Sequence, residues 1–454
     1  MEQNTENTTD QKGLWNFIDN VKGDKVVWII VFMLIMISAL AIFSSTSALT
    51  GENQNRVLQL RSHSLTVLGG LVLIWGLNKI KSVRFFRRIS QTFFVISFIA
   101  LLFLVFNIDL GFIKAATIND ATRSLSLFGF QIHVLEFVKV AMVMYLAWAL
   151  DAYWKDHEEM SNGQPLTTLK WANSLAAKHE KLAFLKKGIW KRILYIYGPM
   201  IATTGLCMKG SNSSMLIVGG ISMIILWIGR MRKRELLAIV VMGVIGIFCL
   251  IGLNHISGGK LLDGFRLDTL ISRITEKQTI DDLTAVENDP TLRKYSSKWF
   301  EIRDDIKQPY TALLAIRQGG LIGKGSGNST QKYIVTHVYS DYVYSLLVEE
   351  YGLFGGLFIM FLYISLLARG ATIARNSSGL YAKLAVGGLS LLITTQALMH
   401  IMVNLDIGFR TGQTLPLISD GRFAFIMFCA AFGVILSISK SAKEEAVVEE
   451  QKQC

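Results

Sequence analysis

The sequence predicts an all-α polytopic membrane protein with ten transmembrane helices and both termini in the cytoplasm. Of its 454 residues, 51% are hydrophobic and only 18% are charged, and the mean hydropathy is +0.41. Apolar runs of about 18 residues or more recur along the chain, and this is the length that crosses a bilayer as a helix. The runs are continuous rather than alternating, which disfavours membrane-spanning strands, because an open sheet edge leaves backbone groups unsatisfied in hydrocarbon.

Ten apolar segments account for the predicted spans. They are residues 25–47, 63–77, 91–108, 133–150, 193–208, 215–228, 236–255, 340–368, 384–404 and 423–439. An even number of crossings puts both ends of the chain on the same side. We therefore expect one membrane domain over residues 25–440, with polar tails at 1–24 and 441–454.

The basic residues predict which side each loop faces. The net charge is +12, and Lys and Arg concentrate in the loops at 79–88, 151–192, 229–235 and 369–383. By the positive-inside rule these loops are cytoplasmic, and residues 257–339 then form a large extracytoplasmic loop between the seventh and eighth helices. Anionic headgroups explain the positive charge, so we expect no nucleic-acid partner. The sequence contains no HExxH motif and no P-loop, so neither a histidine-built metal site nor ATP hydrolysis is indicated.

The most informative stretch is residues 308–356, which contains the glycine-rich segment GGLIGKGSGNSTQK. Glycines allow close backbone approach, and clustered amides beside Lys324 and Lys332 can hold a phosphate. No strand precedes the segment, so a dinucleotide-binding loop is not supported. From spacing alone, a flexible re-entrant loop and a phosphate cradle both remain open.

Charged residues inside or beside apolar spans indicate function by default, because they are costly in lipid. Glu136 and Lys139 are three residues apart and share a helical face, so they can pair as a structural ion pair or line a cavity. Glu349 and Glu350 lie about two turns into the eighth span, where they can face a cavity, cap loop backbone or pair with a basic group. Arg123 precedes the fourth span as an interfacial arginine.

The glycine-rich stretch and two further blocks resemble the SEDS family (shape, elongation, division and sporulation) of peptidoglycan polymerases. The segment IHVLEFVK resembles the family's FQPSELAK, and NLDIGFRTGQTLPLISDGRF resembles its NxGxxxGxxPxTGxxLPFISYGGSS. The matching residues of the glycine-rich stretch are Gln308, Ala315, Ile316, Gly319, Gly320, Leu321, Gly323, Lys324, Gly325, Gly327, Asn328, Ser329, Gln331, Lys332, Asp341, Glu349, Glu350, Gly352, Leu353 and Gly355. The resemblance covers about residues 25–440. It departs from the family at Val134, Leu135, Asp420 and Arg422, where the family has Pro, Ser, Tyr and Gly.

The resemblance implies a glycosyltransferase that polymerises lipid II at the outer face of the cytoplasmic (inner) membrane. The first span, GDKVVWIIVFMLIMISALAIFSSTSAL, resembles the cell-division branch, which implies septal synthesis, while the elongation branch stays open. A lipid II flippase and a scaffold for division proteins are the alternatives from other classes. The implied partners are lipid II, the undecaprenyl-linked glycan chain, a class B penicillin-binding transpeptidase and other divisome proteins.

The resemblance also implies the site residues. The family has a catalytic aspartate shortly before the glutamine that matches Gln308, and the run KWFEIRDDIKQ offers Asp305 first, then Asp304, then Glu301. The implied substrate-binding residues are Gln308, Lys324, Asn328, Lys332, Asp341, Glu349, Glu350, Arg123, Glu136, Lys139 and Ser419. A divalent cation, Mg²⁺ or Mn²⁺, is implied as an assistant, with no ligands assigned.

Overall fold

The protein is described here from a computed structural model. The described residues are 23–48, 56–80, 82–109, 113–118, 121–127, 130–164, 168–169, 173–174, 178, 184, 187–256, 297–333, 338–407 and 412–453. The two polar tails and the large loop are thus described only in part, and predictions about residues 1–22 and 257–296 lie outside this set.

Long helices make up most of the described chain. The helices and short helical turns are, in order, α2 (Lys25–Ser45), η1 (Thr46–Ala48), α3 (Arg56–Lys79), α4 (Val83–Val105), α5 (Val134–Ser161), α7 (Gly188–Arg192), the π-helical turn η3 (Ile193–Tyr197), α8 (Gly198–Gly210), α9 (Asn212–Ile228), α10 (Lys233–Ile256), α13 (Ser297–Gly319), η4 (Gln331–Tyr333), α14 (Val343–Asn376), α15 (Leu380–Asn404) and α16 (Arg422–Gln453). A helix occupies each of the ten predicted spans. Six of the described helices, namely α2, α3, α4, α14, α15 and α16, are long and apolar enough to cross a membrane. The chain is therefore a polytopic, mainly helical membrane protein, and ten crossings stay a prediction.

Several helices continue beyond the predicted spans. α5 runs on to Ser161, α14 to Asn376 and α16 to Gln453. The physical reason is that an apolar run marks the part of a helix that lies in hydrocarbon, whereas helical hydrogen bonding continues into water until a capping or breaking residue ends it.

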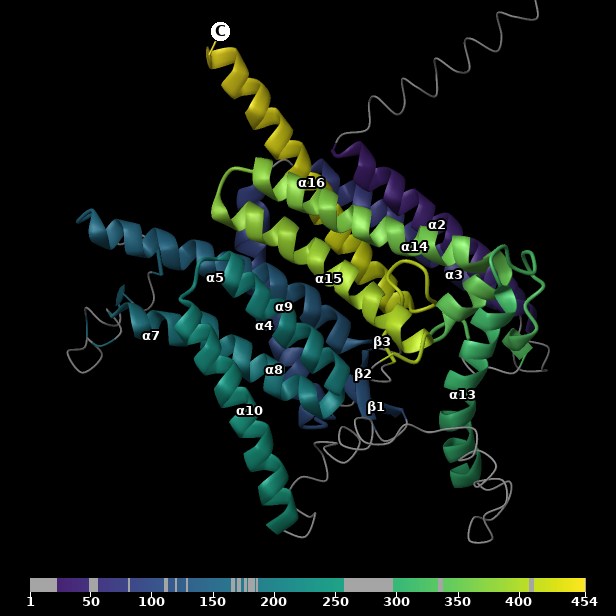
Figure 1. Ribbon diagram of the computed structural model, residues 1–454. Coiled ribbons are helices and arrows are strands. Elements are labelled where there is room, and N and C mark those ends of the chain that lie inside the picture. Colours follow the sequence, from purple (N-terminus) through teal and green to yellow (C-terminus); the bar gives the residue numbers. More distant parts are fainter. Residues whose placement is uncertain are drawn as a thin grey trace, which may run out of the picture.

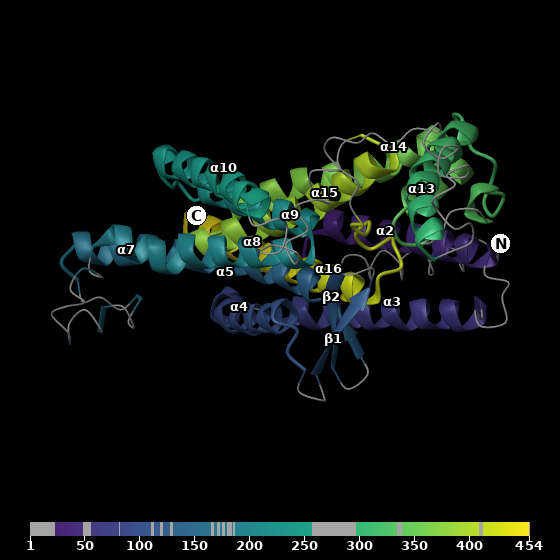
Figure 2. The ribbon, with the colours of Figure 1, turned by 90° about the horizontal axis from the view of Figure 1, so that it is seen from below.

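The bundle is layered. Figure 2 shows α3 and α4 on one side, α14 and α15 on the opposite side, and α5 and α16 between them. α10 and α13 diverge from the common direction of the bundle, at different places (Figure 1). Figure 1 also shows that α13 and the small sheet lie toward the same end of the bundle, away from the end of α16.

A three-stranded antiparallel sheet connects α4 to α5, which the all-α prediction did not include. It contains β1 (Ile113–Ile118), β2 (Ala121–Leu127) and β3 (Phe130–Ile132), in that order. Leu125 of β2 is buried in a cluster with residues of α4 and α5. The strands do not span the bundle, so the predicted absence of membrane-spanning strands and the small sheet are compatible.

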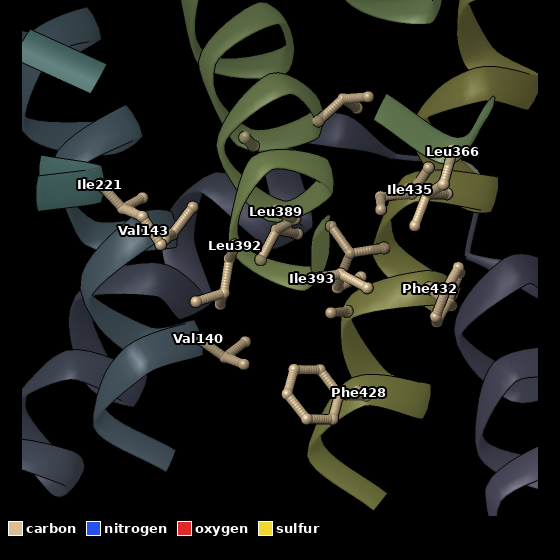
Figure 3. Close-up of a cluster of buried hydrophobic side chains, with 14 of the residues drawn as sticks. Val140, Val143, Ile221, Leu366, Leu389, Leu392, Ile393, Phe428, Phe432 and Ile435 are labelled. Carbon is tan, nitrogen blue, oxygen red and sulfur yellow. The ribbon is translucent and has the colours of Figure 1, made fainter. Parts of the chain in front are cut away.

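The core centres on α15. Figure 3 shows Leu389, Leu392 and Ile393 of α15 between Val140 of α5 and Phe428 of α16. All five side chains are buried. Inside a bilayer such packing stabilises the bundle mainly through van der Waals contact, because lipid tails are as apolar as the core itself.

One polar cluster ties three helices together at the end of the bundle that carries the start of α2. The Asp24 carboxylate accepts hydrogen bonds from the backbone of Val26 and Val27, 3.1 and 3.2 Å away, as the N-cap of α2. Arg369 of α14 donates to the same carboxylate from Nε at 2.9 Å and from Nη2 at 2.7 Å. The Asp24 N–H donates to Ser439 of α16. The start of α2 and this part of α16 therefore lie together, as an even number of crossings requires.

We predict that Asp24→Ala lowers the melting temperature of the detergent-solubilised protein by several degrees. The substitution removes an N-cap, which is worth about 0.5–2 kcal/mol, and leaves the Arg369 guanidinium without its carboxylate. Ser82→Ala is the matched control, because Ser82 is the N-cap residue of α4 but makes no side-chain capping bond. Equal melting temperatures for the two variants would contradict the role given to Asp24.

Candidate functional site

The glycine-rich segment connects α13 to α14 and is hydrogen-bonded into α14. An uninterrupted helix would pair the carbonyls of Glu349 and Glu350 with the N–H groups of Leu353 and Phe354, four residues on. Here the Glu349 carbonyl accepts from Lys324 N at 3.0 Å and the Glu350 carbonyl from Gly325 N at 2.9 Å.

The freed N–H groups of α14 turn to the same segment. Leu353 N donates to the Gly320 carbonyl at 2.9 Å, and Phe354 N donates to the Leu321 carbonyl at 3.3 Å. The segment thus replaces two helical hydrogen bonds with four bonds of its own. We call this arrangement the α14 splice, defined by residues 320–325 and 349–354.

Two glycines permit the α14 splice. Gly352 has φ 71° and ψ −174°, a conformation that interrupts α14 and that side chains rarely adopt. A Cβ there would lie 2.2 Å from the Leu321 carbonyl oxygen, and a Cβ on Gly323 would lie 2.3 Å from the Glu350 carbonyl oxygen. Any larger residue would therefore push the two backbones apart.

The Glu349 carboxylate fixes the rest of the segment. Its side chain is 0% exposed and pairs with Lys324 Nζ at 2.5 Å. It also accepts from the Ser329 hydroxyl, from the Thr330 N–H at 3.0 Å and hydroxyl at 2.9 Å, and from the Gln331 N–H. A buried carboxylate needs such a set of donors, because an unpaired charge there is strongly destabilising.

Lys324 connects this group to α13. Its ammonium also donates to Gln318 Oε1 at 2.6 Å and to the Thr330 hydroxyl at 2.9 Å. Its side chain remains 27% exposed. The Lys324 ammonium therefore reaches the surface while its hydrogen bonds fix its orientation.

Glu350, the next residue, faces a different neighbour. Its Oε1 accepts a hydrogen bond from Ser44 at the end of α2. Its Oε2 is buried and has no hydrogen-bond partner among the described residues. The two glutamates therefore have different contacts: one organises the glycine-rich segment, and the other contacts a neighbouring helix.

Lys139 forms a second polar centre within the bundle. It is 2% exposed, and its ammonium donates to Glu136 at 2.6 Å, confirming the predicted pair. The same ammonium donates to Gln396 of α15 and to Gln413, each at 2.7 Å. Lys139 thereby joins α5, α15 and the segment 412–421, which precedes α16.

The segment 412–421 in turn contacts the turn that precedes α14. The Ser419 hydroxyl donates to the Ser340 carbonyl at 2.7 Å, and Asp420 N donates to the Tyr339 carbonyl at 2.9 Å. Asn404 donates to the Asp341 carbonyl at 3.2 Å. Burial and the carboxylates of Asp420 and Asp341 raise the pKa of the Tyr339 hydroxyl.

Six of the predicted site residues fall into two described groups. Lys324, Asn328, Lys332 and Glu349 lie together on the glycine-rich segment and the start of α14, while Glu136 and Lys139 lie on α5. The Lys332 ammonium is buried and donates to the Gly327 carbonyl at 2.6 Å. Asn328 donates from its side chain to the Lys324 carbonyl at 3.0 Å. Their predicted roles in holding substrate stay predictions.

Five other predicted residues are placed only by their backbone or burial. Gln308 lies half-buried in α13. Glu301, Asp304 and Asp305 lie in the first half of α13 and Arg123 lies in β2, but their side chains are outside the described residues. Thr330, Gln396 and Gln413 were not among the predicted site residues. The two glutamines lie in or beside apolar segments, where a polar side chain is itself a signal.

The described residues do not fit a metal ion. They contain no group of three or more His, Cys, Asp or Glu side chains that could hold one. The Glu349 oxygens already accept hydrogen bonds from protein donors. The divalent cation stays an expectation from the resemblance, with no described ligand set.

Comparison with known proteins gives a consistent result. Residues 24–444 match the FtsW/RodA/SpoVE family model, which is described as "Cell cycle protein". A relative from Coxiella burnetii, named "Probable peptidoglycan glycosyltransferase FtsW", is 25% identical over 388 residues, which are 83% of this chain and 85% of that protein.

Two solved structures share the fold. The crystal structure of the Thermus thermophilus rod shape determining protein RodA has a TM-score of 0.53 and 19% identity, covering 93% of this chain and 98% of that one. A chain from a structure described as a peptidoglycan synthase complex that coordinates polymerization and crosslinking has a TM-score of 0.53 and 21% identity, covering 92% and 98%.

We predict that Glu349→Ala accelerates amide hydrogen exchange at Thr330 and Gln331 by about 10- to 100-fold. Hydrogen bonds to a charged acceptor contribute about 1.5–3 kcal/mol, and both amides lose that acceptor. Glu350→Ala is the control, because the Glu350 side chain makes no bond to these amides. If exchange at the two amides were the same in both variants, the carboxylate would not be what holds the segment.

Proposed function

The chain belongs to the FtsW/RodA/SpoVE family of cell cycle proteins, and we propose that it is a peptidoglycan glycosyltransferase that polymerises lipid II. The observation that carries the proposal is the family match over residues 24–444, which includes the α14 splice and the Lys139 centre. A relative similar over 83% of this chain is named for that activity. The proposed location is the outer face of the cytoplasmic membrane.

The proposed reaction joins two lipid-linked sugars. The 4-hydroxyl of the GlcNAc of one lipid II attacks C1 of the MurNAc at the end of the growing chain. The new C–O bond forms as the bond to undecaprenyl pyrophosphate breaks, and the hydroxyl proton passes to a base. Such a reaction needs a base within hydrogen-bond reach of the hydroxyl and positive charge near the leaving pyrophosphate.

We propose Asp305 as the base, with Asp304 and Glu301 as the next candidates. Positions 301, 304 and 305 are spaced i, i+3 and i+4 along α13, so they fall on one face of that helix. α13 is joined to the glycine-rich segment at Gly319, and Gln318 near its end accepts from Lys324. This connection supports a site in which the carboxylates of α13 and the glycine-rich segment act together.

We propose Lys324 as a cation for the pyrophosphate. Glu349 fixes the orientation of its ammonium while part of its side chain stays exposed. Lys139 and Lys332 are buried and donate to protein acceptors, which favours positioning roles for them. The described residues gather no ligand set for a metal ion, and the side chains of Asp304 and Asp305 lie outside them.

We propose a role in septal synthesis during cell division, with a single-span class B penicillin-binding transpeptidase as partner. The first span and the FtsW relative support the division role. Elongation is the alternative, since the rod shape determining protein RodA shares the fold. Similarity to a chain of a peptidoglycan synthase complex supports a transpeptidase partner.

We predict that Asp305→Ala lowers polymerisation of lipid II by the purified protein by at least about 100-fold. A positioned general base contributes about 10²- to 10⁴-fold. Glu158→Ala is the control, because Glu158 is an exposed carboxylate near the C-terminal end of α5.

The same assay compares the other candidate carboxylates and distinguishes the proposed enzyme from a flippase. If Asp305→Ala and Asp304→Ala both polymerised at the wild-type rate, the proposed base would be wrong. If wild-type protein in vesicles moved labelled lipid II across the bilayer without polymerising it, a flippase would replace the proposed enzyme.

A further inference from the structure

A hollow lies between α9, α14 and α15, far from the glycine-rich segment. Its volume is about 500 Å³, within the range of sites that hold small molecules. Ile224 and Ile228 of α9, Leu367 and Ala371 of α14, and Leu391 of α15 form its apolar wall. The hollow adjoins the last turns of α14, whereas the α14 splice lies near the start of that helix.

Small residues line the hollow, which is only partly enclosed. A Cβ on Gly387 would meet only the Ala374 Cβ, at 3.9 Å, so the space beside this glycine is free of other protein atoms. Ile228 is 52% exposed. An apolar space that opens sideways into hydrocarbon is filled by lipid chains, because no water is present there to occupy it.

Two cations mark the mouth of the hollow. Arg375, in the last turn of α14, and Lys383, in the first turn of α15, both line it and are exposed. Neither forms an ion pair within the part of the chain that the structure describes. The N-terminus of α15 at Gly379 has no side-chain cap. The partial positive charge at this helix end therefore adds to the positive charge of Lys383.

We propose that this hollow holds one anionic phospholipid, with an acyl chain against the apolar wall and the phosphate between Arg375 and Lys383. The basic loops 229–235 and 369–383 place this end of the bundle on the predicted cytoplasmic side, where anionic lipids are enriched. A bound lipid here ties α9 to the α14–α15 pair at the end of the bundle opposite the proposed reaction.

The test is native mass spectrometry of the full-length detergent-solubilised protein with phosphatidylglycerol or phosphatidylcholine of identical chains. We expect one retained phosphatidylglycerol and no retained phosphatidylcholine. Arg375→Gln combined with Lys383→Gln weakens retention by about 30-fold, since each basic group near a charged surface contributes about fivefold. Gly387→Leu fills the hollow and also removes the retained lipid.

Matched controls keep the test specific. Arg84→Gln combined with Arg88→Gln removes two exposed cations from another predicted cytoplasmic loop, and Gly220→Leu adds the same side chain to α9 at a glycine with no atom within 4 Å of its Cβ. Both controls retain the lipid. Equal retention of the two lipids, unchanged retention in the hollow variants, or a dimer that Gly387→Leu abolishes would each overturn the proposal.

Discussion

The structure depends on the buried carboxylate of Glu349 and on two hydrogen bonds of α14 that are replaced by bonds to the glycine-rich segment. In the α14 splice, the backbone of the glycine-rich segment accepts and donates the hydrogen bonds that the next turn of α14 would make. The Glu349 side chain pairs with Lys324 of the same segment. Neither feature is stable alone. The interrupted helix needs the loop to satisfy its backbone groups, and the buried charge needs the donors of the loop.

This constraint extends to the rest of the site through short connections. Lys324 reaches Gln318 at the end of α13, so the helix that carries the proposed base is joined to the splice. The turn before α14 contacts the segment 412–421 through Ser419, and Gln413 of that segment accepts from Lys139. The Lys139 group is therefore connected to the turn before α14 through the segment 412–421, whereas the glycine-rich segment contacts α14 itself at residues 349–354.

The sequence predicted the membrane class, a helix at each of the ten spans, and the Glu136–Lys139 pair, because apolar length and i, i+3 spacing are local signals. The Asp24–Arg369 contact joins residues 345 apart, and the Lys139 contact with Gln413 joins residues 274 apart, so no local pattern could show either. The sequence does contain a signal for the β1–β2 hairpin: polar and apolar residues alternate over Ser124–Leu127, after Asn119–Asp120. A search for long apolar spans does not detect so short an alternation. The α14 splice could not be predicted from the sequence, because the spacing of glycines does not determine which backbone carbonyls will accept hydrogen bonds from which N–H groups.

The most direct test of this account is a double-mutant cycle between Lys324 and Glu349, measured as kcat/KM for lipid II polymerisation. Lys324→Met and Glu349→Gln are compared separately and together in the purified protein. If the pair shapes the site as one unit, each single variant loses about tenfold or more and the double variant is no worse than the poorer single. Losses that multiply in the double variant, or single variants with wild-type activity, would contradict it.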